Sequence, residues 1–231
     1  MISLLPSRIR VASLLRLFSL GLALGLLCGC KTARLSDPVT GPSYRPDNVY
    51  VSFKQLPVGL RRVAVLPPTC DSAKSDLVAG LDSLTAVITE ELGKTKKFEL
   101  VIVTPEQLRA WTGRSAWQAE ETLPAKLLEH LHEQLDCDAV LFSRLTQYRA
   151  YPPLAVGFSF KLAEVQQAEL VWVADEIFDA SEPSVVNSAR RYQLTREHLP
   201  SSLSDSRSIL NSPSGFGRYA ASSVFQTLPA R

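Results

Sequence analysis

The sequence lacks the short motifs that mark the common enzyme classes. It has no G-x-S-x-G nucleophile turn, no glycine-rich phosphate loop and no H-E-x-x-H zinc motif. A long run of one charge is also missing, because 25 Lys and Arg stand against 23 Asp and Glu without a long basic stretch. We therefore predict no catalytic residues, no metal and no cofactor, and we expect no nucleic-acid partner.

Histidine and cysteine are scarce, with three and four copies. His130 and His132 stand near Glu133 and Cys137, but residues two apart on a helix do not share a face, so solvated helix positions are favoured over a metal site. Cys70 follows one predicted strand and Cys137 precedes another. If these strands are parallel neighbours, the thiols lie about 20 Å apart at opposite ends of the sheet, which favours free thiols over a disulfide.

The longest apolar run is too short to cross a membrane comfortably. Residues 17–27, LFSLGLALGLL, carry no charge and no proline, and they follow a segment with three arginines and no acid. At 1.5 Å per residue, a helix of this length covers about half of the ~30 Å hydrocarbon core of a bilayer. The basic start followed by this run predicts a secretory signal over residues 1–29.

Two cysteines stand one residue apart in LLCGCK, at the end of this run. A C-x-C pair without further ligands falls short of a closed metal site, and a disulfide across one residue is strained. Leu27, Cys28, Gly29 and Cys30 resemble the lipobox of bacterial lipoproteins. The resemblance implies cleavage after Gly29 and a lipid on Cys30. The alternative is an ordinary signal peptide with an incidental cysteine pair.

A lipid on Cys30 makes the membrane a partner of the chain. Several acyl chains, at about 0.8 kcal/mol per buried methylene, anchor a protein durably. Lys31 follows Cys30, whereas the enterobacterial sorting rule needs Asp there for retention at the inner membrane. The resemblance therefore implies a lipoprotein of the bacterial envelope that faces the periplasm from the outer membrane.

The rest of the chain divides by composition and hydrophobic period. Residues 30–60 read as the lipidated cysteine and a proline-rich tether, with a short edge strand near residues 49–53. Residues 61–180 are expected to form the main domain. Residues 181–214 are polar, and we expect loose order there with one short helix. Residues 215–231 have a helical period and predict a terminal helix that docks on the domain.

The main domain alternates between two hydrophobic periods. Apolar runs predict strands near residues 61–66, 98–103, 139–145, 154–162 and 170–178. Leucines at steps of three and four predict a helix over residues 75–94, and residues 105–135 read as two helical pieces divided near Gly113 and Pro124. The order β-α-β-α-β-β-β predicts an α/β (α+β) fold, in which helices pack on a mixed sheet as a two-layer or three-layer-like sandwich.

Two further groups of side chains have open roles. Trp111 and Trp117 either anchor a partner, since Trp is favoured at interface hot spots, or pack in the core beneath the second helical segment. Asp175 and Glu176 point to opposite faces of a strand and make a poor acid/base pair. We expect one of them to form a cross-strand ion pair with Arg144 or Arg149.

The strand and helix sequences also resemble those of a group of envelope lipoproteins. The matching segments are RRVAVLPP after a proline-rich tether, a helix ending in LGKTKKFELV, and the strands in LDCDAVLFSRL and LVWVADEIFDA. Over residues 60–180 they resemble the periplasmic domain of the curli-export lipoprotein, the Pel-export lipoprotein and the activators of penicillin-binding proteins. The resemblance implies a non-enzymatic interaction or assembly protein, either a homo-oligomer or a protein that docks on an export or cell-wall complex. The alternative is a pore-forming secretion component that inserts β-hairpins formed by residues 154–162 and 170–178.

Overall fold

The computed structural model describes residues 39–196 and 205–231. The chain divides into two units, Met1–Ser36 and Asp37–Arg231, and only the second is described here. The predicted signal sequence and the four lipobox positions, Leu27, Cys28, Gly29 and Cys30, lie outside the described residues. Within the described part, no helix is both long and apolar enough to cross a membrane.

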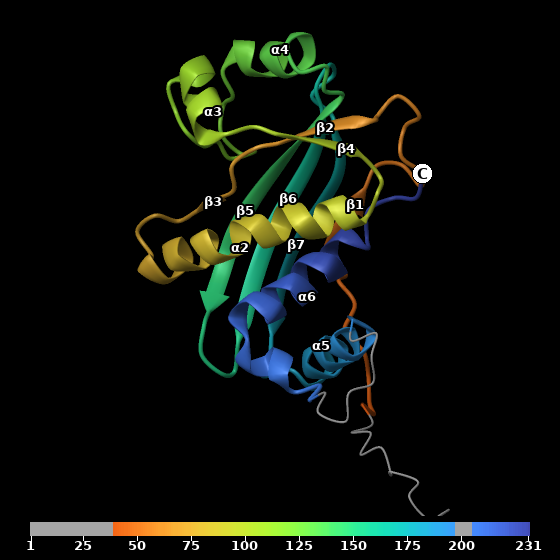
Figure 1. The fold of residues 1–231 in the computed structure, drawn as a ribbon. Coiled ribbons are helices and arrows are strands. Elements are labelled where there is room, and N and C mark those ends of the chain that lie inside the picture. Colours follow the sequence, from red (N-terminus) through yellow and green to blue (C-terminus); the bar gives the residue numbers. More distant parts are fainter. Residues whose placement is uncertain (1–38, 197–204) are drawn as a thin grey trace, which may run out of the picture. The chain divides into compact units, whose positions relative to one another are not determined.

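A seven-stranded mixed sheet forms the centre of this unit (Figure 1). The strands are β1 (Val49–Val51), β2 (Arg62–Val65), β3 (Thr69–Cys70), β4 (Glu99–Ile102), β5 (Ala139–Arg149), β6 (Ala155–Glu164) and β7 (Leu170–Asp179). Their order is β1-β7-β6-β5-β2-β4, and β3 also pairs with β5. The predicted α/β (α+β) mixed sheet is therefore confirmed, as is the edge strand near residue 49.

The connections between strands explain the mixture of directions. Helical crossovers join β2 to β4 and β4 to β5, and the pairs β2–β4 and β2–β5 are parallel. Short turns join β5 to β6 and β6 to β7, and these pairs are antiparallel. The strand β1 also pairs with β7 in the antiparallel sense. The long strands β5, β6 and β7 thus form a meander at the centre of the sheet.

The helices begin and end where the sequence provides signals. They are α2 (Ser75–Lys94), α3 (Pro105–Thr112), α4 (Ala125–Glu133), α5 (Pro183–Arg196) and α6 (Pro213–Phe225), with a 3₁₀ turn at Ser208–Asn211. The bounds of α2 agree with the prediction. Thr104 and Gln107 form a capping box at the start of α3, and Gly113 ends that helix with a φ of 79°. Pro124 immediately precedes α4.

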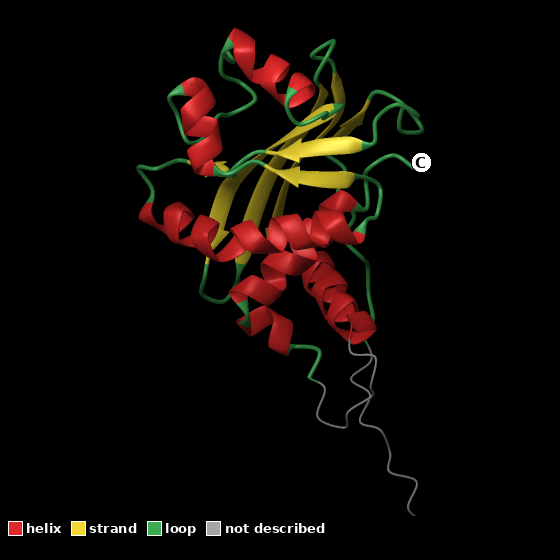
Figure 2. Cartoon of the chain, turned by 45° about the horizontal axis from the view of Figure 1, so that its top comes forward, coloured by secondary structure: helices red, strands yellow, loops and turns green. Residues whose placement is uncertain are grey.

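The helices cover both faces of the sheet (Figures 1 and 2). Adjacent residues of β5 show this division: Leu141 belongs to the larger core with α2, α5 and α6, whereas Val140 and Phe142 belong to a second core with α3 and α4. The larger core contains Phe158, Phe160 and Trp172 from β6 and β7. The two cores therefore share β5, whose alternating side chains enter one or the other.

The segments on either side of the main domain lie on it as well. Leu56 and Leu60 are buried, and the Leu56 N–H donates to the Ala230 carbonyl at 2.8 Å. The described part of the predicted tether, residues 39–60, thus follows the surface of the domain. In the polar segment 181–214, α5 extends over 14 residues, longer than the short helix we expected, because Val185 and Ala189 are buried in the larger core.

Candidate interaction surface

A buried carboxylate fixes the chain that leads into β1. Glu176 of β7 is 4% exposed. Its Oε2 accepts from the Tyr44 hydroxyl at 2.5 Å, and its Oε1 accepts from the backbone N–H groups of Asp47 and Asn48 at 2.6 and 2.7 Å. Burial and the neighbouring carboxylate raise the pKa of Tyr44. Three donors therefore satisfy a carboxylate that would be costly to bury alone.

Helix α5 holds the same segment from the other side. Arg191 donates to the carbonyls of Val39 and Gly41 at 3.3 and 2.7 Å and also to the Ser43 hydroxyl. The Tyr44 N–H donates to Ser188 Oγ at 2.8 Å. We call residues 39–48 the entry segment. Its contacts with α5 and β7 place β1 at the edge of the sheet.

The edge formed by β1 carries exposed apolar side chains. Tyr50, Val51 and Phe53 are 58%, 39% and 45% exposed, and Leu170 at the start of β7 is 42% exposed. We call these four residues the β1 edge surface. They follow the same edge of the sheet because Tyr50 pairs with Val173, Val51 pairs with Trp172, and Ser52 donates to the carbonyls of both Val171 and Leu170. Tyr50 and Val51 are adjacent in the strand, so their side chains extend from opposite faces of this edge.

The backbone of β1 adds polar groups to this surface. The backbone N–H and C=O groups that point toward β7 belong to Asn48, Tyr50 and Ser52. The Asp175 N–H donates to the Asn48 carbonyl, and the Ser52 N–H donates to the Val171 carbonyl. In an antiparallel pair, the alternate residues Val49 and Val51 direct their N–H and C=O groups away from the partner strand. An edge strand with outward backbone groups and exposed apolar side chains is a surface on which another protein can pair or pack.

The predicted cross-strand ion pair is wrong in its acidic partner. Arg149 pairs with Asp179 at 2.7 Å, not with Asp175 or Glu176. Asp175 is exposed, and Glu176 is engaged by the entry segment. The alternation of the strand correctly separates the two acids onto opposite faces. The alternation does not reveal that Glu176 binds Tyr44, which is more than a hundred residues away in sequence.

Trp111 and Trp117 are both half-buried at the margin of the second core. Trp117 donates from Nε1 to Thr112 Oγ1 at 2.8 Å, and the Arg114 guanidinium lies 4.1 Å from its ring centroid. The Trp111 ring centroid lies 5.6 Å from that of His130. Each indole is thus partly packed and partly accessible, and a role of either one as a partner anchor stays a prediction.

His130 and His132 have separate local partners. His130 contacts Gln134 at 2.9 Å, and His132 contacts Gln166 at 3.3 Å. Within residues 39–196 and 205–231, no three His, Cys, Asp or Glu side chains are grouped to hold a metal ion.

Cys70 and Cys137 are free thiols, as expected. Cys70 is paired with Leu145 of β5, whereas Cys137 precedes the first residue of the same strand. At about 3.3 Å per residue the two thiols are separated by roughly 26 Å along the strand. Burial raises the pKa of Cys137 to about 11.

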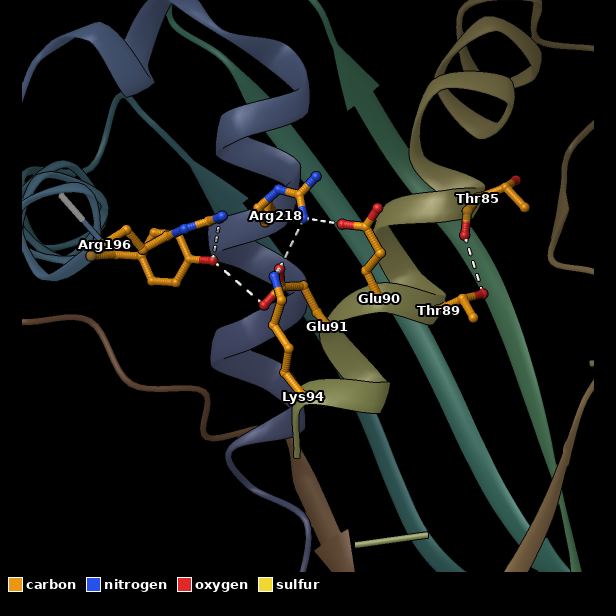
Figure 3. A network of polar contacts seen from close by, with 8 residues as sticks. Thr85, Thr89, Glu90, Glu91, Lys94, Arg196 and Arg218 are labelled. Atoms are coloured by element: carbon orange, nitrogen blue, oxygen red, sulfur yellow. Dashed lines mark hydrogen bonds and ion pairs between the residues drawn. The ribbon is translucent and has the colours of Figure 1, made fainter. Parts of the chain in front are cut away.

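A second polar cluster joins three helices (Figure 3). Glu91 of α2 is 4% exposed, and it contacts Lys94 Nζ at 2.5 Å, Arg218 of α6 at 3.2 Å and the Tyr192 hydroxyl of α5 at 3.5 Å. Arg218 also pairs with Glu90, and this contact lowers the pKa of Glu90 and raises that of Arg218. Because the buried carboxylate is matched by two cations, the cluster holds the helices together and offers no free general base.

An open groove of ≈ 570 Å³ lies beside this cluster. Its lining residues are Glu91, Lys94, Thr95, Tyr192, Thr195, Arg196, Ser222 and Gln226. Arg196 donates to the Tyr192 hydroxyl at 3.2 Å and stacks over that ring. The groove is mixed in charge, and its central carboxylate is already engaged, so we place the candidate interaction surface at β1 instead.

Comparison with known proteins adds a similarity in fold. No family model and no curated protein matches the chain. The PelC dodecamer from Paraburkholderia phytofirmans aligns with 81% of this chain and 95% of its own, at 17% identity and a TM-score of 0.41. The LpoB C-terminal domain from Escherichia coli aligns with 51% of this chain and 82% of its own, at 20% identity and a TM-score of 0.35. Lipoprotein GNA1162 from Neisseria meningitidis aligns with 51% and 79%, at 19% identity and a TM-score of 0.33. At these values the similarity concerns the fold only, and no conclusion about function rests on it.

Proposed function

We propose that this chain is a lipid-anchored protein of the bacterial envelope that faces the periplasm and acts by binding other proteins, without catalysis. The observation that carries the proposal is the β1 edge surface, where apolar side chains and outward backbone groups remain exposed beside a firmly bound entry segment. The lipobox-like residues Leu27 to Cys30 supply the anchor.

The mechanism is positional. The lipid on Cys30 would fix one end of the chain at the membrane, and Arg191 fixes Val39 and Gly41 on the domain. Because each residue spans at most ~3.6 Å, the chain between Cys30 and Val39 reaches at most about 32 Å. The β1 edge surface is then presented within a limited distance of the membrane, where an envelope partner or a second copy of the chain meets it.

No observation favours the pore-forming alternative. The hairpin it requires corresponds to β6 and β7, which lie inside the sheet and are each paired on both sides. Their side chains Phe158, Phe160 and Trp172 are fully buried in the larger core. Moving these strands into a membrane would remove the centre of that core.

Photo-crosslinking in intact cells tests the protein-binding proposal. A photo-reactive residue in place of Tyr50 is expected to give discrete crosslinked products, whereas the same group at Leu194 of α5, which is 43% exposed, serves as the matched control. Equal product patterns from both positions, or none from position 50, would contradict the proposal. The product masses distinguish a second copy of this chain from another envelope protein.

The anchor is tested separately by fractionation. The Cys30→Ser chain should move from the membrane fraction to the soluble periplasmic fraction, because the acyl chains no longer bind the bilayer. A Cys28→Ser chain is the control and should remain in the membrane fraction, since position 28 leaves with the signal. Light scattering of the Cys30→Ser protein then gives its oligomeric state, and a discrete multiple would favour a closed homo-oligomer.

A further inference from the structure

One arginine on the face of the sheet opposite α2 and α6 has a side chain without a hydrogen bond or an ion pair to the described residues, although its charge acts on the nearby Glu120. Val140 and Phe142 of β5 point into the second core, so Arg144, two residues further along, lies on the same face. It is paired in the sheet with Thr69 of β3 and with Ser159 of β6. Arg144 is therefore surrounded by strands on both sides.

The neighbouring cations on these strands all have acids. Lys161 of β6 contacts Glu120 at 2.6 Å, and Arg149 of β5 contacts Asp179 at 2.7 Å. The Arg144 side chain, in contrast, has no hydrogen bond or ion pair within the described ranges, and its Nε is buried without an acceptor. A buried, charged donor without an acceptor costs free energy, so this site is chemically incomplete.

The space beside Arg144 is small, and its lining combines charged and polar side chains with the apolar Phe142 and Ala119. It is lined by Arg144, Lys161, Thr69, Ser159, Gln118 and Glu120, among others, and has a volume of ≈ 10 Å³ for a water-sized probe. Thr69 and Ser159 are both 8% exposed. A volume of this order admits about one water or one carboxylate oxygen, and it is too small for a phosphate group or a drug-sized ligand.

The charges around this space select the ligand. Arg144 and Lys161 carry two positive charges, and Glu120 carries one negative charge, so one positive charge is left over. Glu120 already shows that a carboxylate fits against Lys161. An arginine with a free Nε–H can donate a charge-assisted hydrogen bond to one oxygen of another carboxylate.

We propose that Arg144 is the recognition point for a carboxylate of a bound protein: one carboxylate oxygen of an Asp or Glu side chain enters the space beside Thr69, Ser159 and the Glu120–Lys161 pair. This inference deepens the proposed function and rests on it, because it gives the chemistry of the partner. The acid of the partner supplies the acceptor that Nε lacks, and Lys161 adds a second positive charge at the edge of the site.

The site itself can be tested with acetate as the probe. In the intact chain, labelled with ¹⁵N-arginine and held in detergent, the Arg144 Nε–H resonance should shift saturably with sodium acetate but not with sodium chloride at equal ionic strength. Loss of the signal in Arg144→Lys assigns it. The matched control is Arg149, which lies on the same strand and is already paired with Asp179. The absence of a saturable shift, an equal shift at Arg149, or saturation by inorganic phosphate and not by acetate would each overturn the inference.

A substitution of Glu120 tests whether Lys161 and Arg144 act on the same ligand. Glu120→Gln removes the negative charge beside Lys161 but keeps the shape of the side chain. Because this charge no longer repels acetate, the acetate concentration at half-saturation should fall several-fold. Glu121→Gln, next in sequence and paired with Arg114 instead, is the control and should leave that concentration unchanged. An unchanged value in Glu120→Gln would show that the two cations do not act on the same ligand.

The protein partner is tested in cells. A photo-reactive residue in place of Gln118, at the rim of the space, should give a crosslinked product that disappears with Arg144→Gln and persists with Arg149→Gln. A product that is indifferent to Arg144→Gln overturns the inference. The acetate titration needs no partner, so its failure leaves the protein-binding proposal standing. The failure of crosslinking at Tyr50 would instead contradict that proposal and leave the acetate result in place.

Discussion

The hydroxyl of Tyr44 donates a 2.5 Å hydrogen bond to the buried carboxylate of Glu176, and this contact joins residues 132 positions apart in sequence. The same carboxylate accepts from two backbone N–H groups, those of Asp47 and Asn48. Glu176 thus determines where the entry segment ends and where β1 begins. Its removal should affect the edge of the sheet first.

Glu176→Ala should destabilise the protein by roughly 2–4 kcal/mol, because it leaves three donors without an acceptor in a partly buried site. Tyr44→Phe removes one of the three bonds and should cost about 1 kcal/mol. Urea unfolding gives both values, and Asp175→Ala, an exposed acid next to Glu176, is the control with little effect expected. Hydrogen exchange at the Asp47 and Asn48 amides should accelerate in Glu176→Ala, and unchanged exchange there would argue against this role.

The crossing of α2 and α6 depends on a residue without a side chain. A Cβ on Gly217 of α6 would overlap the Leu84 side chain of α2, which is fully buried. Gly217→Ala should therefore destabilise the protein by about 1–3 kcal/mol through overpacking. Gly59→Ala, where the added Cβ meets nothing within 4 Å, is the matched control. In thermal or urea unfolding, Leu84→Ala combined with Gly217→Ala should cost less than the sum of the two single changes, and additivity would refute the steric explanation.

Acid should weaken the fold through Glu120. The hydrogen bond from Lys161, assisted by the charges of Lys161 and Arg144, lowers the pKa of Glu120 below its ordinary value of 4.5. The unfolded chain therefore binds the proton more readily than the folded chain, so the stabilisation is complete above pH 4.5 and is lost as the pH falls through the lower, folded value. Urea midpoints measured from pH 6 to pH 3 should fall less steeply in Glu120→Gln than in the unmodified chain. Parallel curves for the two proteins would contradict this assignment.

The two described thiols should stay reduced and react slowly. Burial raises the pKa of Cys137 to about 11. Burial and, to a smaller extent, the negative charge of the nearby Asp71 raise the pKa of Cys70. Both thiols are therefore mostly protonated at pH 8. Iodoacetamide labelling followed by mass spectrometry should modify Cys137 only after unfolding in urea, whereas the partly exposed Cys70 should react at an intermediate rate. Fast labelling of native Cys137 would contradict its burial, and an oxidised Cys70–Cys137 peptide would contradict the separation of the two thiols along β5.

The regular elements were predictable because their signals are local. The leucine period of residues 75–94 predicts the bounds of α2, alternating side chains predict β6, and the apolar run that follows a turn predicts β7. Helix α5 was harder, since its sequence is polar and rich in Arg and Ser. It is held by contacts that the sequence does not reveal, such as those of Arg191 with the Val39 and Gly41 carbonyls.

The candidate surfaces were less predictable than the fold. VYVSF at residues 49–53 predicted an edge strand, but only the structure shows that Tyr50, Val51 and Phe53 remain exposed on it. The roles of Glu176 and Arg144 depend on which long-range partners are present or missing. Such pairing requires the three-dimensional arrangement, and no spacing along the chain encodes it.

Helix α6 comes last in the chain yet completes its largest core. The Phe225 ring lies 4.7 Å from that of Phe160, and Trp172 donates from Nε1 to Thr227 Oγ1 at 3.0 Å. A chain still emerging from the ribosome therefore leaves the aromatic residues of β6 and β7 uncovered until α6 has been synthesised. The order of synthesis thus keeps the larger core open until α6 is present.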